Sequence, residues 1–297
     1  MVTHVLRSRD GRRLWVQEWG NPNGTPVFLL HGTPGSRLGP RPRDALLYRQ
    51  GIRLITYDRP GYGDSDRLPG RRVEHAAADV ADIADRLSIK EFSVVGRSGG
   101  GPHTLACAAL LPDRVRRAAA LVSLAPPDAE GLDWLAGMTE GNVTQYSIAR
   151  LGHDELARRL EALGAELRAD PASCMPFDDA ALPESDQAVI ADYGIKNMLV
   201  NNFAEGLRTS VFGWIDDNLS FVQPWGFRPR DIFVPLLLWH GMDDIFSPVS
   251  HTSWLAGQIR HAGVEIVPRA AHFASVAVLP EVLRWLAGAQ DKLAGAA

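Results

Sequence analysis

The sequence contains few cysteines and no long apolar run, and each scarcity excludes a class of protein. The two cysteines among its 297 residues, Cys107 and Cys174, lie far apart and lack metal-ligand partners at useful spacing. We therefore expect reduced, mostly buried thiols, with no disulfide scaffold, metal site or redox chemistry. No apolar run reaches about 18 residues and residues 1–13 lack the apolar stretch of a secretory signal, so we expect a cytoplasmic protein that does not enter a membrane.

Lysine is also scarce, since only three of the 31 basic residues are lysines (Lys90, Lys196 and Lys292). The many arginines favour either anion recognition or, more simply, a coding bias. They are dispersed along a chain of net charge −4, which predicts that the protein does not bind nucleic acid. The hydrophobic fraction of 45% is typical of a globular chain with a large core.

Short apolar runs bounded by glycine or proline recur along most of the chain. The first twenty residues predict a hairpin around Asp10-Gly11. Six later runs predict strands that are buried on both faces: 27–30, 52–57, 92–95, 118–124, 235–239 and 264–267. Helical periodicity separates them, most clearly at 71–87. This alternation predicts an α/β fold with a mostly parallel, doubly wound sheet.

The alternation stops between residues 127 and 231. That stretch has helix-like segments at 154–168 and 186–213, prolines between them, and no convincing strand. It predicts a helical lid inserted into a catalytic core made of residues 1–126 and 232–297.

A candidate nucleophile follows the predicted strand 92–95. The chain reads Gly96-Arg97-Ser98-Gly99-Gly100 and continues into an alanine- and leucine-rich helix, which is the strand, turn and helix context of a Gly-x-Ser-x-Gly nucleophile elbow. The serine occupies a strained turn there, and the flanking glycines let strand and helix approach closely. Ser98 is therefore the predicted nucleophile.

Two backbone N–H groups are the candidates for binding an oxyanion. Gly99, directly after the nucleophile, supplies one, and a second is expected from a loop that follows an earlier strand. The loop His31-Gly32-Thr33-Pro34-Gly35 fits that place. Because Pro34 has no N–H, Thr33 is the predicted second donor.

A serine hydroxyl needs a histidine base, and the histidine needs an acid that orients it. His272 lies a few residues after the last predicted strand, where it can reach the same sheet edge as Ser98. His31 and His240 are directly followed by glycine and are interpreted as loop-packing residues. Asp244 is the predicted acid, with Asp243 as the alternative, because both follow the penultimate strand.

Four side chains are candidates for contact with a substrate. The aromatic residues of 212–227 either line an apolar pocket or fasten the lid to the core, and Trp214, Trp225 and Phe227 are chosen from them. Arg97 precedes the nucleophile. Such a residue makes either a structural ion pair beneath the elbow or a contact with an acidic substrate.

With these motifs placed, the chain resembles the α/β-hydrolase superfamily over nearly its whole length. Within it, the His-Gly-x-Pro-Gly loop resembles that of proline iminopeptidases and related lidded esterases. The stretch 57–65 also resembles that group, which implies shaping roles for Asp58 and Ser65. In that group the acid falls four residues after the histidine of His240-Gly241-Met242-Asp243-Asp244, which favours Asp244.

The resemblance is not complete. Proline iminopeptidases have a Gly-Gly-Ser-Trp-Gly-Ser elbow, which this chain lacks, and their cap glutamates have no clear counterpart beyond Glu184 and Glu205. Serine at position 98 disfavours the dehalogenase and epoxide hydrolase branches, which use aspartate. The expected activity is hydrolysis of a carboxylic ester, lactone, thioester or amide of a small, mainly apolar molecule without a cofactor. The alternatives are a proline iminopeptidase-like aminopeptidase, or an acyltransferase, a lyase or a ligand-binding protein on the same scaffold, and a homo-oligomer is left open.

Overall fold

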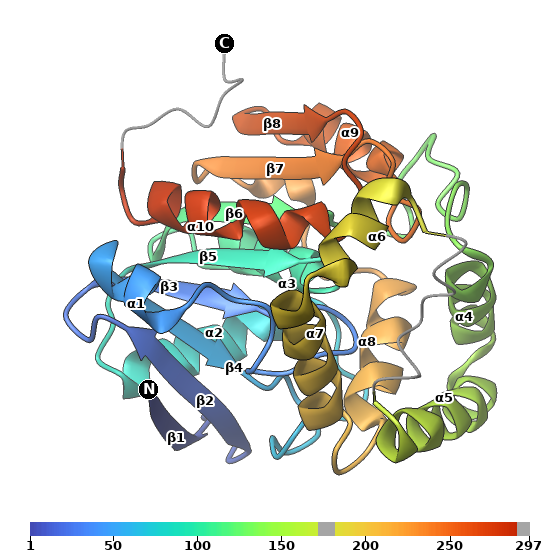
Figure 1. The fold of residues 1–297 in the computed structure, drawn as a ribbon, viewed down its shortest axis with the longest axis horizontal. Coiled ribbons are helices and arrows are strands. Elements are labelled where there is room, and N and C mark those ends of the chain that lie inside the picture. Colours follow the sequence, from blue (N-terminus) through green and yellow to red (C-terminus); the bar gives the residue numbers. More distant parts are fainter. Residues whose placement is uncertain (172–181, 290–297) are drawn as a thin grey trace.

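The computed structural model describes residues 1–171 and 182–289. Its eight strands form one sheet in the order β1-β2-β4-β3-β5-β6-β7-β8 (Figure 1). The strands are β1 (Val2–Arg7), β2 (Arg13–Gly20), β3 (Thr25–Leu30), β4 (Ile52–Tyr57), β5 (Phe92–Arg97), β6 (Val115–Leu121), β7 (Leu236–Gly241) and β8 (Ala262–Val267). β2 pairs antiparallel with both β1 and β4. Every other neighbouring pair in the sheet, from β4 through β3 to β8, is parallel. The hairpin and the six predicted strands are confirmed, with ends shifted by a few residues.

Helices cover both faces of the sheet, so each strand contributes to two cores. Val94 of β5 packs in one core and Val95 in the other, because successive side chains of a strand point to opposite faces. The first core includes side chains of α2 (His75–Arg86), α3 (Gly100–Leu110) and α9 (Val249–Gln258). The second includes side chains of α1 (Asp44–Arg49) and α10 (Ala274–Leu286). The doubly wound α/β architecture is therefore confirmed.

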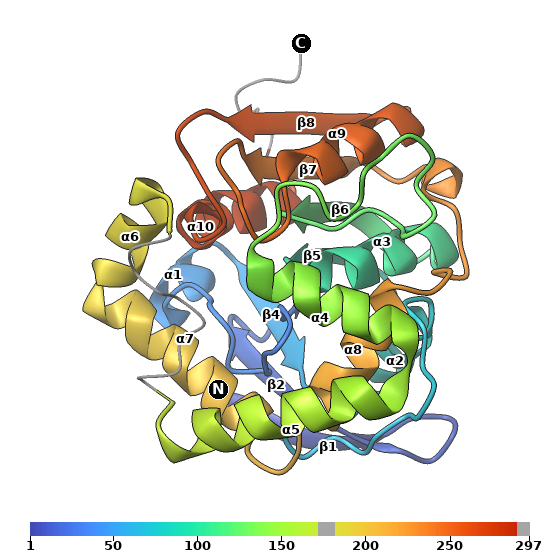
Figure 2. The ribbon, with the colours of Figure 1, turned by 90° about the vertical axis from the view of Figure 1, so that its right-hand side faces the viewer.

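Five α-helices lie between β6 and β7 in the described part of the chain, and we call them the insert. They are α4 (Glu140–Leu151), α5 (His153–Ala169), α6 (Glu184–Ala191), α7 (Tyr193–Gly206) and α8 (Phe212–Phe221). No strand occurs between β6 and β7 in the described part of the chain, as predicted. The single helical segment expected at 186–213 is wrong, because Asp192 caps a new helix and α8 begins only at residue 212. Figures 1 and 2 show the insert beside the carboxyl ends of the parallel strands.

The described residues include one of the two cysteines. Cys107 is a free thiol, buried in α3, whereas Cys174 lies outside the described residues. Within the described ranges, no helix is both long and apolar enough to cross a membrane.

Candidate active site

Ser98 occupies the sharp turn that the elbow motif predicts. Its φ angle is +56°, and its N–H donates to the Leu121 carbonyl of β6 at 2.9 Å. A Cβ at Gly96 would lie 2.1 Å from the Gly100 carbonyl oxygen, and one at Gly100 would lie 2.2 Å from the Leu30 carbonyl oxygen. Only glycine fits at these two positions, and the close approach that they allow places Ser98 above the end of β5.

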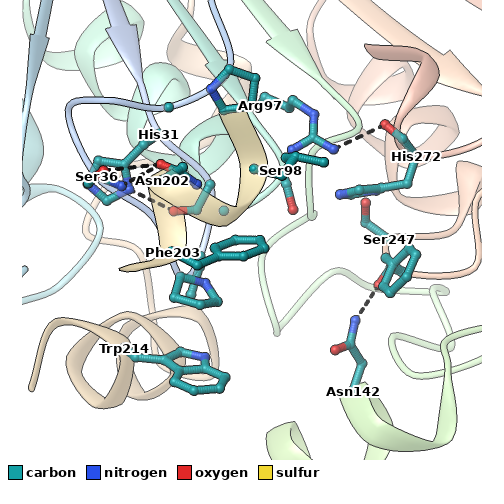
Figure 3. A pocket seen from close by; sticks show the side chains of 18 of the residues that line it. His31, Ser36, Arg97, Ser98, Asn142, Asn202, Phe203, Trp214, Ser247 and His272 are labelled. Atoms are coloured by element: carbon teal, nitrogen blue, oxygen red, sulfur yellow. Dashed lines mark hydrogen bonds between the residues drawn. The ribbon is translucent and has the colours of Figure 1, made fainter. Parts of the chain in front are cut away.

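His272 and Asp244 come together beside Ser98. The Nδ1 atom of His272 lies 2.8 Å from Oδ2 of Asp244, and Figure 3 shows the ring pointing toward Ser98. Asp244 also accepts hydrogen bonds from the backbone N–H groups of Phe246 at 2.8 Å and Ser247 at 3.0 Å. Asp243 is exposed, so the geometry favours Asp244 over its neighbour.

The environment of Asp244 keeps it ionised. Burial alone would raise the pKa of this carboxyl, but the nearby His272 and hydrogen bonds from His240 and His272 bring the pKa well below its ordinary value. An ionised Asp244 holds a proton on Nδ1 of His272, which leaves Nε2 able to accept one. His240 is itself held by Thr252 at 2.7 Å and by the Ser247 carbonyl at 2.6 Å, in agreement with its predicted packing role.

The two predicted oxyanion donors meet at the elbow. A Cβ at Gly99 would lie 2.2 Å from Oγ1 and 3.1 Å from N of Thr33, so the Thr33 loop and the elbow are in direct contact. Within the described residues, neither the Thr33 N–H nor the Gly99 N–H has a hydrogen-bond partner. Both residues line the same cavity as Ser98. Two unused amide donors at this place can bind an oxygen that becomes negatively charged.

A buried carboxylate of the insert supports the Thr33 loop. Asp217 of α8 accepts hydrogen bonds from Oγ1 of Thr33 at 2.5 Å, from Arg59 at 2.5 Å and from Tyr62 at 2.8 Å, and it pairs with Arg71 at 2.6 Å. Burial would raise the pKa of Asp217, but Arg59 and Arg71 bring it well below its ordinary value. Arg59 also donates to the His31 and Gly32 carbonyls of the same loop. Sequence reasoning missed this cluster.

A second carboxylate of the insert contacts the histidine loop. Asp186 of α6 is fully buried and accepts hydrogen bonds from the backbone N–H groups of His272 at 3.1 Å and Phe273 at 2.7 Å. These groups precede α10, so Asp186 satisfies free donors at a helix start from another part of the chain. Burial raises the pKa of Asp186, although the nearby His272 and Arg97 oppose this. Sequence reasoning missed Asp186 too.

A cavity of about 530 Å³ lies between the core and the insert. Its lining includes the Ser98 and His272 side chains from the core and Trp214 from α8 (Figure 3). Trp225 and Phe227 do not line it, which corrects their choice as substrate contacts. Trp225 is buried in the first core with Phe227 packed against it, because the chain after α8 turns back toward α2, where the Glu74 N–H donates to the Trp225 carbonyl at 3.1 Å. Here the aromatic residues fasten the insert to the core.

Arg97 lines the cavity but makes no ion pair with any described residue. Its Nε donates to Oγ of Ser275 at 2.5 Å and its Nη2 to the His272 carbonyl at 3.4 Å. Within the described ranges, no carboxylate oxygen lies within 4.0 Å of it. The structural ion pair expected for Arg97 is therefore wrong, and the alternative of a substrate contact remains.

The shaping residues implied by the resemblance have structural partners. Asp58 is buried, accepts the Arg37 N–H at 2.6 Å and pairs with the Arg37 guanidinium, while burial raises its pKa to about 6. Ser65 accepts the Trp15 N–H at 2.9 Å. Glu205 pairs with Arg37 at 2.7 Å and does not line the cavity. These contacts shape the loops around the site.

Residues 25–276 match the alpha/beta hydrolase fold family, and the chain belongs to that family. A non-heme haloperoxidase of Rhodococcus erythropolis is 27% identical over 90% of this chain and 92% of its own. A bifunctional esterase/perhydrolase of Acinetobacter calcoaceticus is 25% identical over 82% of this chain and 83% of its own. The bromoperoxidase structure from Bacillus anthracis superposes with a TM-score of 0.70 at 20% identity, covering 96% of this chain and 99% of that one, which shows the shared fold.

Proposed function

We propose that the protein is a serine hydrolase that cleaves the carboxylic ester, or a related lactone, thioester or amide, of a small molecule. The observation that carries this proposal is the 2.8 Å contact between His272 and Asp244 beside a serine with a φ of +56°. A relative described as a bifunctional esterase/perhydrolase supports the same class of chemistry. The site contains its own base and acid, so this reaction requires no cofactor.

In the proposed reaction, Ser98 attacks the carbonyl carbon while His272 takes the hydroxyl proton at Nε2. Asp244 stabilises the resulting imidazolium by charge and by the hydrogen bond at Nδ1. The N–H groups of Thr33 and Gly99 bind the oxygen that becomes negative, and His272 then gives its proton to the leaving alcohol. Water, activated by the same histidine, attacks the acyl-serine and releases the acid and the free enzyme.

The insert acts in this proposal as the lid, over residues 127–231. From the insert, the apolar side chains Leu163, Leu167, Phe203 and Trp214 line the cavity that also contains Ser98. A cavity of about 530 Å³ is of the size that small-molecule sites occupy. We therefore assign selection of a small acyl or alcohol group to the insert.

Ester hydrolysis is favoured over removal of an N-terminal proline. An aminopeptidase needs an unpaired carboxylate to bind the substrate's free amine. Of the two candidate glutamates, Glu205 is paired with Arg37 and Arg208, and neither Glu205 nor Glu184 lines the cavity. Among the described residues the carboxylate that lines the cavity is Glu166, which is exposed to solvent, so neither of the two glutamates implied by the resemblance is available to bind an amine there.

A panel of p-nitrophenyl esters of increasing acyl length, beside a prolyl arylamide, tests the proposed function. We expect hydrolysis of short esters with kcat/KM reduced by about 1,000-fold or more in Ser98→Ala, because the acyl-serine cannot form. Far-ultraviolet circular dichroism of the variant checks that it is folded. Cleavage of the arylamide alone would replace the esterase with an aminopeptidase, and equal rates in the parent and the variant would remove Ser98 from the reaction.

A further inference from the structure

Arg97 differs from the other buried arginines of the described chain. Four arginines are at most 9% exposed: Arg37, Arg59, Arg71 and Arg97. The first three each form an ion pair, with Asp58, Asp217 and Asp217 respectively. Arg97, in contrast, has only a hydroxyl and a carbonyl as hydrogen-bond acceptors. A buried cation without a matching anion is unfavourable, so its retention calls for an explanation.

The unpaired part of Arg97 faces the cavity. Nε and Nη2 are used by Ser275 and His272, while Nη1 has no hydrogen-bond partner in the described part of the chain. Nη1 lies 4.0 Å from the place that a Cβ of Gly32 would occupy, and Gly32 also lines the cavity. Figure 3 shows the guanidinium between Ser98 and the His272 backbone. A donor of Arg97 is thus available next to the nucleophile.

The nearest carboxylates are already occupied by other donors. Asp244 accepts from His272 and two backbone N–H groups, and Asp186 accepts from the His272 and Phe273 N–H groups. Both act on Arg97 only at longer range, and burial still lowers the pKa of Arg97 to about 10. Neutralisation of Arg97 by the protein is therefore incomplete.

A second arginine, without an ion pair to any described residue, lines the same cavity from the insert. Arg159 of α5 has a buried Nε atom without a hydrogen-bond partner, and none of the described carboxylates forms an ion pair with it. The acidic side chain in the lining is Glu166, which is exposed. Among the described lining residues, two arginines thus stand against one exposed carboxylate, a balance that favours the binding of an anion.

We propose that the substrate carries a carboxylate and that Arg97 binds it through Nη1, so that the enzyme acts on monoesters of short dicarboxylic acids. This inference rests on the proposed hydrolase function. The place of a Gly32 Cβ lies 4.0 Å from Nη1 of Arg97 and 3.7 Å from Cβ of Ser98, so a carboxylate bound at Nη1 lies only a few bonds from the scissile carbonyl. A guanidinium suits this task because it presents several N–H donors in a plane and stays charged when buried. Arg159 adds charge from the side of the insert.

The test compares two substrates with the same glutaryl chain, p-nitrophenyl hemiglutarate, which carries a free carboxylate, and its methyl ester, which does not. For the parent enzyme we expect kcat/KM to be at least about tenfold higher for the anionic substrate, the range of one charge-assisted hydrogen bond. Arg97→Gln should lower the ratio of the two kcat/KM values by about 10- to 100-fold. Ser275→Ala is the matched control: it removes a neighbour of Arg97 but keeps the charge, so the ratio should persist.

The other possible outcomes show whether carboxylate binding by Arg97 or the proposed hydrolase function is wrong. If Arg97→Gln slows both esters equally, Arg97 only positions the His272 loop and the inference is overturned. A parent enzyme that favours the methyl ester overturns it as well. If neither ester is cleaved by the parent, the proposed function fails, which is a different result from an unchanged ratio.

A measurement on the parent enzyme keeps the test valid if Arg97→Gln does not fold. Glutarate and glutaramide are compared as inhibitors of the hydrolysis of p-nitrophenyl butyrate. We expect the inhibition constant of glutarate to be at least about tenfold lower, and to rise with added salt as charges are screened. Equal inhibition by the dianion and the diamide would contradict binding of a carboxylate in the cavity.

Discussion

Two carboxylates of the insert contact the candidate site, one at the loop of Thr33 and the other at the loop of His272, and they differ in their hydrogen-bond partners. Asp217 lies under the oxyanion loop and is surrounded by side-chain donors, two of them arginines. Asp186 lies behind the histidine loop and, within the described residues, accepts two backbone N–H groups and no side-chain donor. The first contact is a buried ion cluster and the second resembles a helix cap. The difference indicates that the oxyanion side is fixed with the fold, whereas the histidine side is held by a weaker and separable contact.

The largest expected effect comes from Asp217. Asp217→Asn leaves Arg59 and Arg71 buried without their anion, and we expect the free energy of unfolding to fall by about 3–5 kcal/mol. Asp216 is the matched control, because it is the next residue of α8 but pairs with the partly exposed Arg67. Asp216→Asn should lower stability less, by about 1–2 kcal/mol, because Arg67 can still reach water. Urea unfolding of both variants measures the difference. Equal losses of stability would show that the ion cluster around Asp217 stabilises the fold no more than the single pair of Asp216 does.

Replacement of Asp186 is expected to lower stability less than replacement of Asp217, and to lower activity through the His272 loop. Asp186→Ala should lower the free energy of unfolding by about 1–2 kcal/mol, as the loss of a helix cap does. Because the His272 backbone loses its acceptor, kcat for a neutral ester should fall several-fold while KM changes little. Asp186→Asn keeps an acceptor and should restore most of both quantities.

Asp192 provides the control for Asp186. It caps α7 by accepting the Ile195 N–H at 2.9 Å, and no hydrogen bond of it reaches the histidine loop in the described residues. Asp192→Ala should therefore reduce stability and leave kcat near the parent value. A parallel loss of kcat in Asp192→Ala would show that activity follows insert stability rather than the contact at His272.

The smallest effect near neutral pH concerns the segment that leads into the insert. His251 accepts the Ala125 N–H at Nδ1 and lies 3.1 Å from the Trp134 carbonyl at Nε2, and burial lowers its pKa to about 4. The unfolded chain takes up this proton near pH 6.5, so the stabilising effect of neutral His251 is present above that pH and is lost as the pH falls toward 4.

The measurement is the pH dependence of unfolding between pH 7 and 4. Removing His251 should make the free energy of unfolding fall less steeply, by up to about 1.4 kcal/mol per pH unit. His251→Gln tests this, and His153→Gln, at a half-exposed position of α5, is the control. A steepness that is unchanged in His251→Gln would contradict the assignment.

The parts of the fold that sequence predicted are those fixed by short stretches of chain. The strand, Gly-x-Ser-x-Gly turn and helix around Ser98 form one local unit, and the glycines there are required by contacts with Leu30 and with the turn itself. Ser98, Asp244 and His272 could be predicted because each one follows a recognisable strand of the parallel sheet. Six strands could be predicted because a strand that is buried on both faces consists of consecutive apolar residues.

The missed residues depend on contacts between distant parts of the chain. Asp217 meets Thr33 across 184 positions, and Asp186 meets His272 across 86. One signal was present, since Asp216 and Asp217 stand together within the apolar segment that forms α8, where a buried carboxylate needs partners. Sequence could not tell that Trp214 faces the cavity while Trp225 turns into the core, because this depends on the path of the chain after α8.

The most direct test of the central claim, that the fold activates Ser98 through His272 and Asp244, is labelling of the intact folded protein with a fluorophosphonate. Mass spectrometry of the labelled protein locates the modified residue. We expect one phosphonyl group on Ser98 of the parent protein, no label on Ser98→Ala, and much slower labelling of His272→Ala. A folded parent that takes up no label, or takes it up on another residue, would contradict it.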